Sequence, residues 1–79
     1  MKLNDFFKKN GHLKLGLQHL DLNGGVWRIQ IYNTTYDFGI EPVFEHLISD
    51  AEVETCVLDF ETVIMTPILN WWKDSHKDN

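Results

Sequence analysis

The sequence contains one cysteine, two prolines and no apolar run long enough to span a membrane. A lone cysteine, Cys56, cannot form an internal disulfide, which fits a reducing compartment and leaves stabilisation to the hydrophobic core. Charged residues such as Asp5 and Lys8 interrupt the N-terminal stretch, so we expect no signal peptide. These absences predict a cytoplasmic protein that does not enter a membrane.

The composition is that of a folded domain rather than of a disordered or fibrous chain. Of the 79 residues, 43% are hydrophobic and 24% are charged, and such fractions exclude disorder, collagen and low-complexity classes. A chain of this length has room for one core. We therefore predict a single small domain over residues 1–75, followed by a frayed tail at residues 76–79.

Lysine and arginine are missing from more than half of the chain. Residues 1–30 carry five basic and two acidic side chains, whereas residues 31–72, which we call the acidic segment, carry eight acidic and no basic ones. Carboxylates without cationic neighbours repel one another and favour association with basic surfaces. Such carboxylates are also common on proteins in which they only increase solubility. The candidate partner-binding acids are Asp37, Glu41, Glu45, Asp50, Glu52, Glu54, Asp59 and Glu61.

The first half of the chain shows clear local patterns. Apolar side chains three and four residues apart predict a short helix over residues 1–10, and alternation from residue 12 predicts a strand over residues 12–20. Asn23-Gly24-Gly25 is a strong hairpin signal, with the return strand at Val26–Tyr32. A third strand is expected at Tyr36–Ile40, which gives a three-stranded antiparallel meander.

The second half is more ambiguous. Pro42 predicts a helix over residues 41–50, because proline suits the first helical position. Alternation over residues 52–65 favours a fourth strand, although a helix would also gather apolar residues of this span on one face. Thr66-Pro67 predicts the start of a C-terminal helix that reaches about Asp74.

The predicted class is α+β: a short N-terminal helix, the meander, a helix, a fourth strand and a C-terminal helix. The expected core is drawn from all of these elements. It comprises Phe6, Phe7, Leu13, Leu15, Trp27, Ile29, Ile31, Phe44, Leu47, Leu58, Phe60 and Ile64.

No motif of catalysis, cofactor binding or metal binding is present in the sequence. The four histidines lack the spacing of a zinc site, and Gly24-Gly25 lacks the context of a phosphate-binding loop. Cys56 and Asp59 would point to opposite faces of a strand, which argues against a nucleophile–base pair. No basic stripe is available to bind nucleic acid directly. The sequence thus predicts a protein that is not an enzyme.

The adjacent Trp71 and Trp72 point about 100° apart on a helix, so one side of the helix cannot bury both. We expect Trp71 to be partly exposed or to lie at an interface, where tryptophan is enriched. The alternative is that both rings clamp the helix to the sheet beside Trp27.

In size, charge and order of elements, the chain resembles small acidic proteins of phages and other mobile elements, including anti-CRISPR inhibitors. The resemblance rests on the lead helix M-K-L-N-D-F-F-K-K, the N-G-G hairpin and the acidic segment. It implies a binder that occupies the basic nucleic-acid-binding or regulatory surface of a larger protein, such as a nuclease. The alternative is an interaction or immunity-type module, or a homodimer, that uses Trp71 and a sheet edge.

Overall fold

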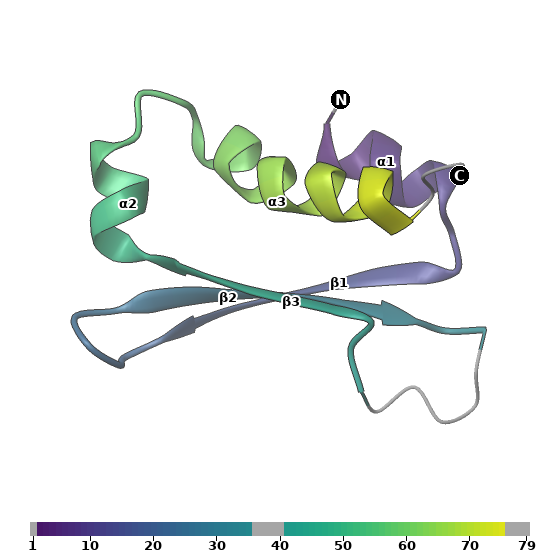
Figure 1. The fold of residues 1–79 in the computed structure, drawn as a ribbon, viewed down its shortest axis with the longest axis horizontal. Helices are drawn as coiled ribbons and strands as arrows, with labels where there is room; N and C mark the ends of the chain where they lie inside the picture. Colours follow the sequence, from purple (N-terminus) through teal and green to yellow (C-terminus); the bar gives the residue numbers. More distant parts are fainter. Residues whose placement is uncertain (1, 36–40, 76–79) are drawn as a thin grey trace.

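The chain forms a sheet with helices on one side of it. The computed structural model describes residues 2–35 and 41–75 (Figure 1). The elements are α1 (Leu3–Lys9), β1 (Leu13–Leu20), β2 (Val26–Asn33), β3 (Phe44–Ser49), α2 (Asp50–Thr55) and α3 (Phe60–Ser75). The predicted α+β class is confirmed.

The sheet is an antiparallel meander in the order β1-β2-β3, so β2 is central and the other two strands are edges. The hairpin between β1 and β2 is closed where it was predicted, with Leu20 opposite Val26. Asn23, Gly24 and Gly25 all have positive φ, a conformation that glycine adopts without steric cost. The N-G-G sequence therefore sets the register of the first two strands.

Alternation along β2 decides which face of the sheet meets the helices. Ile29 and Ile31 are fully buried, whereas Arg28 and Gln30 lie on the opposite face. The buried pair packs in one cluster with Ile64 of α3. Among the described residues, the buried core consists of Phe6, Leu13, Ile29, Ile31, Ile48, Ile64, Met65 and Ile68.

Aromatic contacts connect the two ends of the chain. The ring of Phe6 in α1 meets that of Trp72 in α3 edge to face, with centroids 5.4 Å apart. The backbone amide of Leu3 donates to the carboxylate of Glu61 at 3.2 Å. The first helix is therefore held against the last one.

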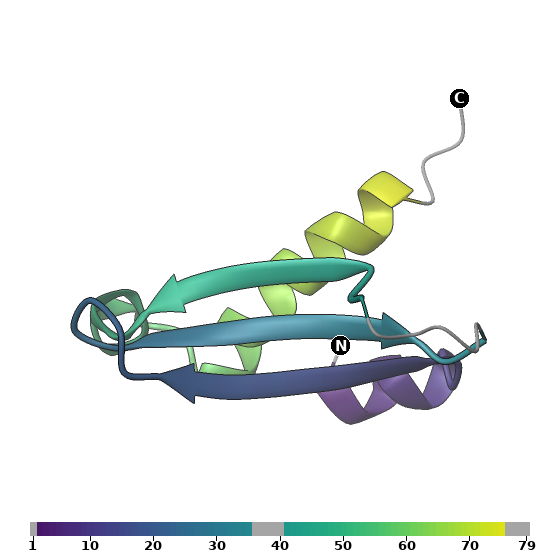
Figure 2. The same cartoon turned by 90° about the horizontal axis from the view of Figure 1, so that it is seen from below.

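The other face of the sheet has no helix over it within the described residues (Figure 2). Polar side chains on this open face bond to one another across the strands. Tyr32 donates to Gln30, which in turn donates to Glu45 at 3.2 Å, and Arg28 donates to Gln18. We call this surface, formed by the outward side chains of β1, β2 and β3, the open face.

The helix predicted over residues 41–50 is wrong: this span contains β3, and α2 begins at Asp50. Apolar residues at 44, 47 and 48 suggested helical spacing. In the structure, Phe44, His46 and Ile48 point to the helix side, while Leu47 points to the open face and is 55% exposed. Because His46 is in an inward position and Leu47 in an outward one, the sequence does not show the alternation of apolar and polar residues that is typical of a strand.

The fourth strand predicted over residues 52–65 is also wrong, because α2, a short connection and the first turns of α3 occupy this span. Both helices begin with side-chain caps. Ser49 accepts from the amide of Glu52, and Asp59 accepts from the amide of Thr62, and these capping bonds favour helix over strand. The C-terminal helix therefore starts at Phe60, six residues before Thr66, and contains Pro67 in its interior.

Three predicted core residues are exposed instead: Leu47, Leu58 and Phe60. Leu47 lies on the open face, and Leu58 lies in the connection before α3. Phe60 still contacts Trp27, with ring centroids 5.1 Å apart. The strand predicted at Tyr36–Ile40 and the tail at residues 76–79 lie outside the described residues.

The two faces of the sheet predict opposite outcomes for two aliphatic substitutions. Ile29→Ala should lower the free energy of unfolding by about 2–5 kcal/mol, because it leaves a cavity under α3. Leu47→Ala on the open face should cost less than about 1 kcal/mol. Chemical denaturation of both variants measures the difference, and similar losses at the two positions would contradict this orientation of the sheet.

Candidate functional site

Acidic side chains gather on α2. Asp50, Glu52 and Glu54 follow one another on this short helix, and Glu52 and Glu54 are exposed. Two of the three lie in its first turn, where a negative charge interacts favourably with the N-terminal backbone amides. The described basic residue nearest in sequence after α2 is Lys73, near the end of α3. The helix thus presents carboxylates that have no lysine or arginine on the same element.

Asp50 differs from its neighbours because it contacts a histidine. Nε2 of His19 lies 3.0 and 2.9 Å from the two carboxylate oxygens of Asp50, and among residues 2–35 and 41–75 this is the one close contact between a carboxylate and a basic side chain. The His19 ring also lies against Trp27, with centroids 4.8 Å apart. Together with Val53 and Glu54, these side chains line a shallow cavity of about 220 Å³.

The hairpin positions this carboxylate. The amide of Asp50 donates to the carbonyl of Gly25 at 3.0 Å, so the start of α2 is attached to the turn between β1 and β2. A Cβ atom at Gly25 would clash with the carboxylate of Asp50. Glycine is therefore needed here both for its positive φ and for space.

Asp59 and Glu61 have structural contacts at the start of α3. Hydrogen bonds from the side chain and the backbone amide of Thr62 lower the pKa of Asp59 below its ordinary value of 3.8. Glu61 accepts from the amide of Leu3. Both residues were predicted to share one face of a strand as partner-binding acids. Their carboxylates instead stabilise the ends of two helices.

The remaining acidic candidates are spread over the molecule. Glu45 lies on the open face, bonded to Gln30, and Glu41 is exposed just before β3. Asp37 lies outside the described residues. The structure thus brings Asp50, Glu52 and Glu54 together on α2 and does not join all the predicted acids into one face.

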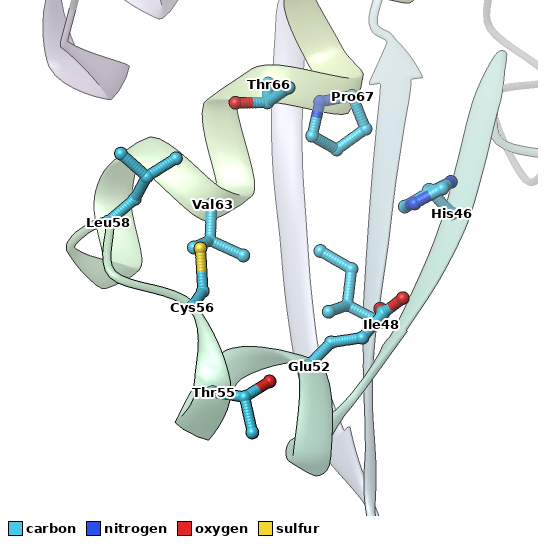
Figure 3. A pocket seen from close by; sticks show the side chains of 9 residues that line it. All are labelled: His46, Ile48, Glu52, Thr55, Cys56, Leu58, Val63, Thr66 and Pro67. Carbon is cyan, nitrogen blue, oxygen red and sulfur yellow. The ribbon is translucent and has the colours of Figure 1, made fainter.

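A groove separates β3, α2 and α3 on the helix side of the sheet. Its volume is about 350 Å³, and it is lined by His46, Ile48, Glu52, Thr55, Cys56, Leu58, Val63, Thr66 and Pro67. Figure 3 shows His46 and Ile48 on β3, with Thr66 and Pro67 across from them on α3. Glu52 is the one acidic side chain in this lining.

Trp71 packs against two other aromatic rings. Its ring lies 5.2 Å from that of Phe44 and 5.9 Å from that of Trp72. Both tryptophans are half-buried and pack against the core. Trp71 is thus partly exposed, as predicted, and its contacts also fit the alternative in which both rings attach α3 to the rest of the protein.

Among residues 2–35 and 41–75, no three His, Cys, Asp or Glu side chains are grouped so that they could hold a metal ion. Cys56 is a free, half-buried thiol in the groove. Within the same described part of the chain, no helix is long and apolar enough to cross a membrane.

Sequence reasoning missed the groove, because its lining comes from three elements whose boundaries were predicted wrongly. One signal for α2 was present: Ser49 and Glu52 have the Ser-x-x-Glu spacing of a helix N-terminus. No local signal could have paired His19 with Asp50, which lie 31 residues apart.

Comparisons with models of known protein families, with curated proteins and with solved structures find no match for this chain.

The contact between Gly25 and Asp50 predicts different effects of alanine at the two hairpin glycines. Both have positive φ, so either change should cost about 1–3 kcal/mol in backbone strain. Only Gly25→Ala also clashes with Asp50, because the space beside Gly24 is empty. We expect Gly25→Ala to be the more destabilising and Asp50→Ala to recover part of the loss in that background alone. Thermal melts of the single and double variants test this coupling.

The capping role of Asp59 predicts a pH-dependent contribution to stability. Because its pKa is lower in the folded protein than the ordinary value of 3.8, ionised Asp59 stabilises the fold above that pH. The contribution is lost as the pH falls through the folded pKa. Asp59→Asn keeps an acceptor but removes the charge, so its melting temperature should lie below wild type at neutral pH and approach it in acid. Melts between about pH 2 and 7 measure the difference, and Asp21→Asn serves as the control that lacks this trend.

Proposed function

We propose that the protein acts by binding, not by catalysis, and that its acidic surface occupies a basic surface of a larger protein. A region that handles nucleic acid, such as that of a nuclease, has this character because lysine and arginine neutralise phosphate there. An acidic protein on that region would act as an inhibitor that takes the place of the nucleic acid. The resemblance to small acidic inhibitors of phages, anti-CRISPR proteins among them, points the same way.

The observation that carries this proposal is the exposed pair Glu52 and Glu54 on α2. Neither carboxylate forms an ion pair within the described residues, and no lysine or arginine lies between residues 31 and 72. Charges of one sign that are left without partners raise the local potential and speed association with a surface of the opposite sign. Asp59 and Glu61 are left out of the proposed surface because their carboxylates already cap helices.

The test is to remove two charges at a time. Affinity capture from the native host, followed by mass spectrometry, identifies the partner, and its dissociation constant is then measured for wild type and Glu52→Gln/Glu54→Gln. Exposed ion pairs contribute about 0.5–1 kcal/mol each, so we expect binding to weaken about five- to thirtyfold. The dependence on salt should become less steep.

The matched control is Asp5→Asn/Asp74→Asn, which also removes two negative charges. Asp5 lies on α1 and Asp74 near the end of α3, at the opposite end of the molecule from α2 (Figure 1). This variant should bind as wild type does. Equal weakening by both variants would mean that net charge alone matters, and no weakening by either would contradict the proposal.

A further inference from the structure

One edge of the sheet carries backbone groups that no neighbouring strand uses within the described residues. The amide of Asp50 bonds to the carbonyl of Gly25, and antiparallel strands alternate between bonded and non-bonded pairs. The backbone groups of Phe44, His46 and Ile48 therefore point toward β2. Those of Glu45, Leu47 and Ser49 point outward, because β3 is the edge of the sheet.

This edge lacks two of the features that usually prevent further strand pairing, namely lysine and proline. Natural edge strands are often protected by lysine, proline or a bulge, and β3, Phe44–Ser49, contains neither lysine nor proline. Its pairing with β2 is continuous from Phe44 to Ser49. The backbone of β3 can thus accept another strand along its length.

The groove lies where side chains of an added strand would point. His46 and Ile48 line it from β3, and Val63 and Pro67 line it from α3 (Figure 3). Every second side chain of a strand paired with β3 would face this helix side, and the others would face the open face beside Glu45. Apolar side chains suit the first position, because most of the surface of the groove is apolar.

The charges near β3 favour this edge over that of β1, and they favour a basic partner. The carboxylate of Glu45 lies on the open face of β3, and that of Glu52 lies at the groove. The edge strand β1 carries Lys14 and no acidic residue, whereas β3 carries Glu45 and leads directly into the acidic helix α2. A basic strand would thus be attracted to β3 and not to β1. A second copy of β3 would bring like charges together.

We propose that β3 binds an extended segment of the partner, in which apolar residues alternate with lysine or arginine, as a fourth strand of the sheet. The apolar side chains enter the groove, and the basic ones lie on the open face beside Glu45. This is strand addition, in which backbone hydrogen bonds supply affinity and alternate side chains supply specificity. The inference rests on the proposed function, since it takes a basic partner as given.

The probe is the heptapeptide Lys-Val-Lys-Val-Lys-Val-Lys, and its binding is followed by NMR. Residues directly opposite each other in antiparallel strands share a face, so the lysines pair with Glu45, Leu47 and Ser49 and point their amides at β3. N-methylation of three lysine amides should weaken binding at least tenfold. N-methylation of the three valine amides keeps the same charge and should leave binding almost unchanged. The amides of Glu45, Leu47 and Ser49 should become protected from exchange with solvent.

Two proline variants test the same geometry from the side of the protein. Leu47→Pro removes an outward N–H of β3 without removing a bond to β2, and it should abolish binding of the peptide. Leu17→Pro is the matched control, since β1 is the other edge and the amide of Leu17 also points outward. NMR spectra confirm folding of both variants. If Leu47→Pro does not fold, the comparison of methylated peptides still decides the question.

The outcomes separate this inference from the proposed function. Equal binding of both methylated peptides, with chemical-shift changes confined to α2, would overturn strand addition. It would not contradict the proposed function of the acidic surface. Absence of binding by every lysine peptide at low salt would overturn strand addition, whereas the proposed function is decided separately by the affinity of Glu52→Gln/Glu54→Gln for the captured partner. Protection of the β3 amides that depends on protein concentration, without peptide, would identify a second copy as the occupant and overturn the inference.

Discussion

The contact on which the structure depends is that of Ile29 and Ile31 in β2 with Ile64 and Ile68 in α3. All four side chains are fully buried, and they join the central strand to the longest helix. Burial of an aliphatic side chain contributes about 1.5–3 kcal/mol, a large share of the stability of a small domain. A chain of 79 residues supplies one such layer of helices. Within residues 2–35 and 41–75, no helix covers the second face of the sheet and no strand pairs with the outer edge of β3.

The acidic helix α2 begins at the end of the sheet, where β3 ends. Ser49 ends β3 and also caps α2, so the edge strand leads into the acidic helix without an intervening loop. Gly25 fixes the same junction from the hairpin, through its bond to the amide of Asp50. The acidic helix is thus attached both to the edge strand, through the Ser49 cap, and to the hairpin, through the amide of Asp50.

The sequence was sufficient to predict the first half of the fold but not the second. Period-two alternation and the N-G-G turn are local signals, and they located β1, the hairpin and β2 correctly. In β3, an inward His46 and an outward Leu47 reversed the expected polarity, and only pairing with β2 shows which face each one occupies. The capping residues Ser49 and Asp59 decided that the following spans are helices, although alternation favoured a strand. The acids of α2 were among the candidates that the sequence offered, and the structure places them on one helix, whereas the groove depends on three elements that meet only in the folded chain.

The packing of the first helix against the last one has a consequence for folding of the newly made chain. The amide of Leu3 bonds to Glu61, 58 residues later, and the ring of Phe6 lies against Trp72. The meander precedes α3 in the chain, so Ile29 and Ile31 stay in contact with water until α3 packs against the sheet. Such an unprotected sheet favours aggregation of newly made chains. Slow docking of α3, rather than slow formation of the hairpin, would then limit the yield of native protein in the cell.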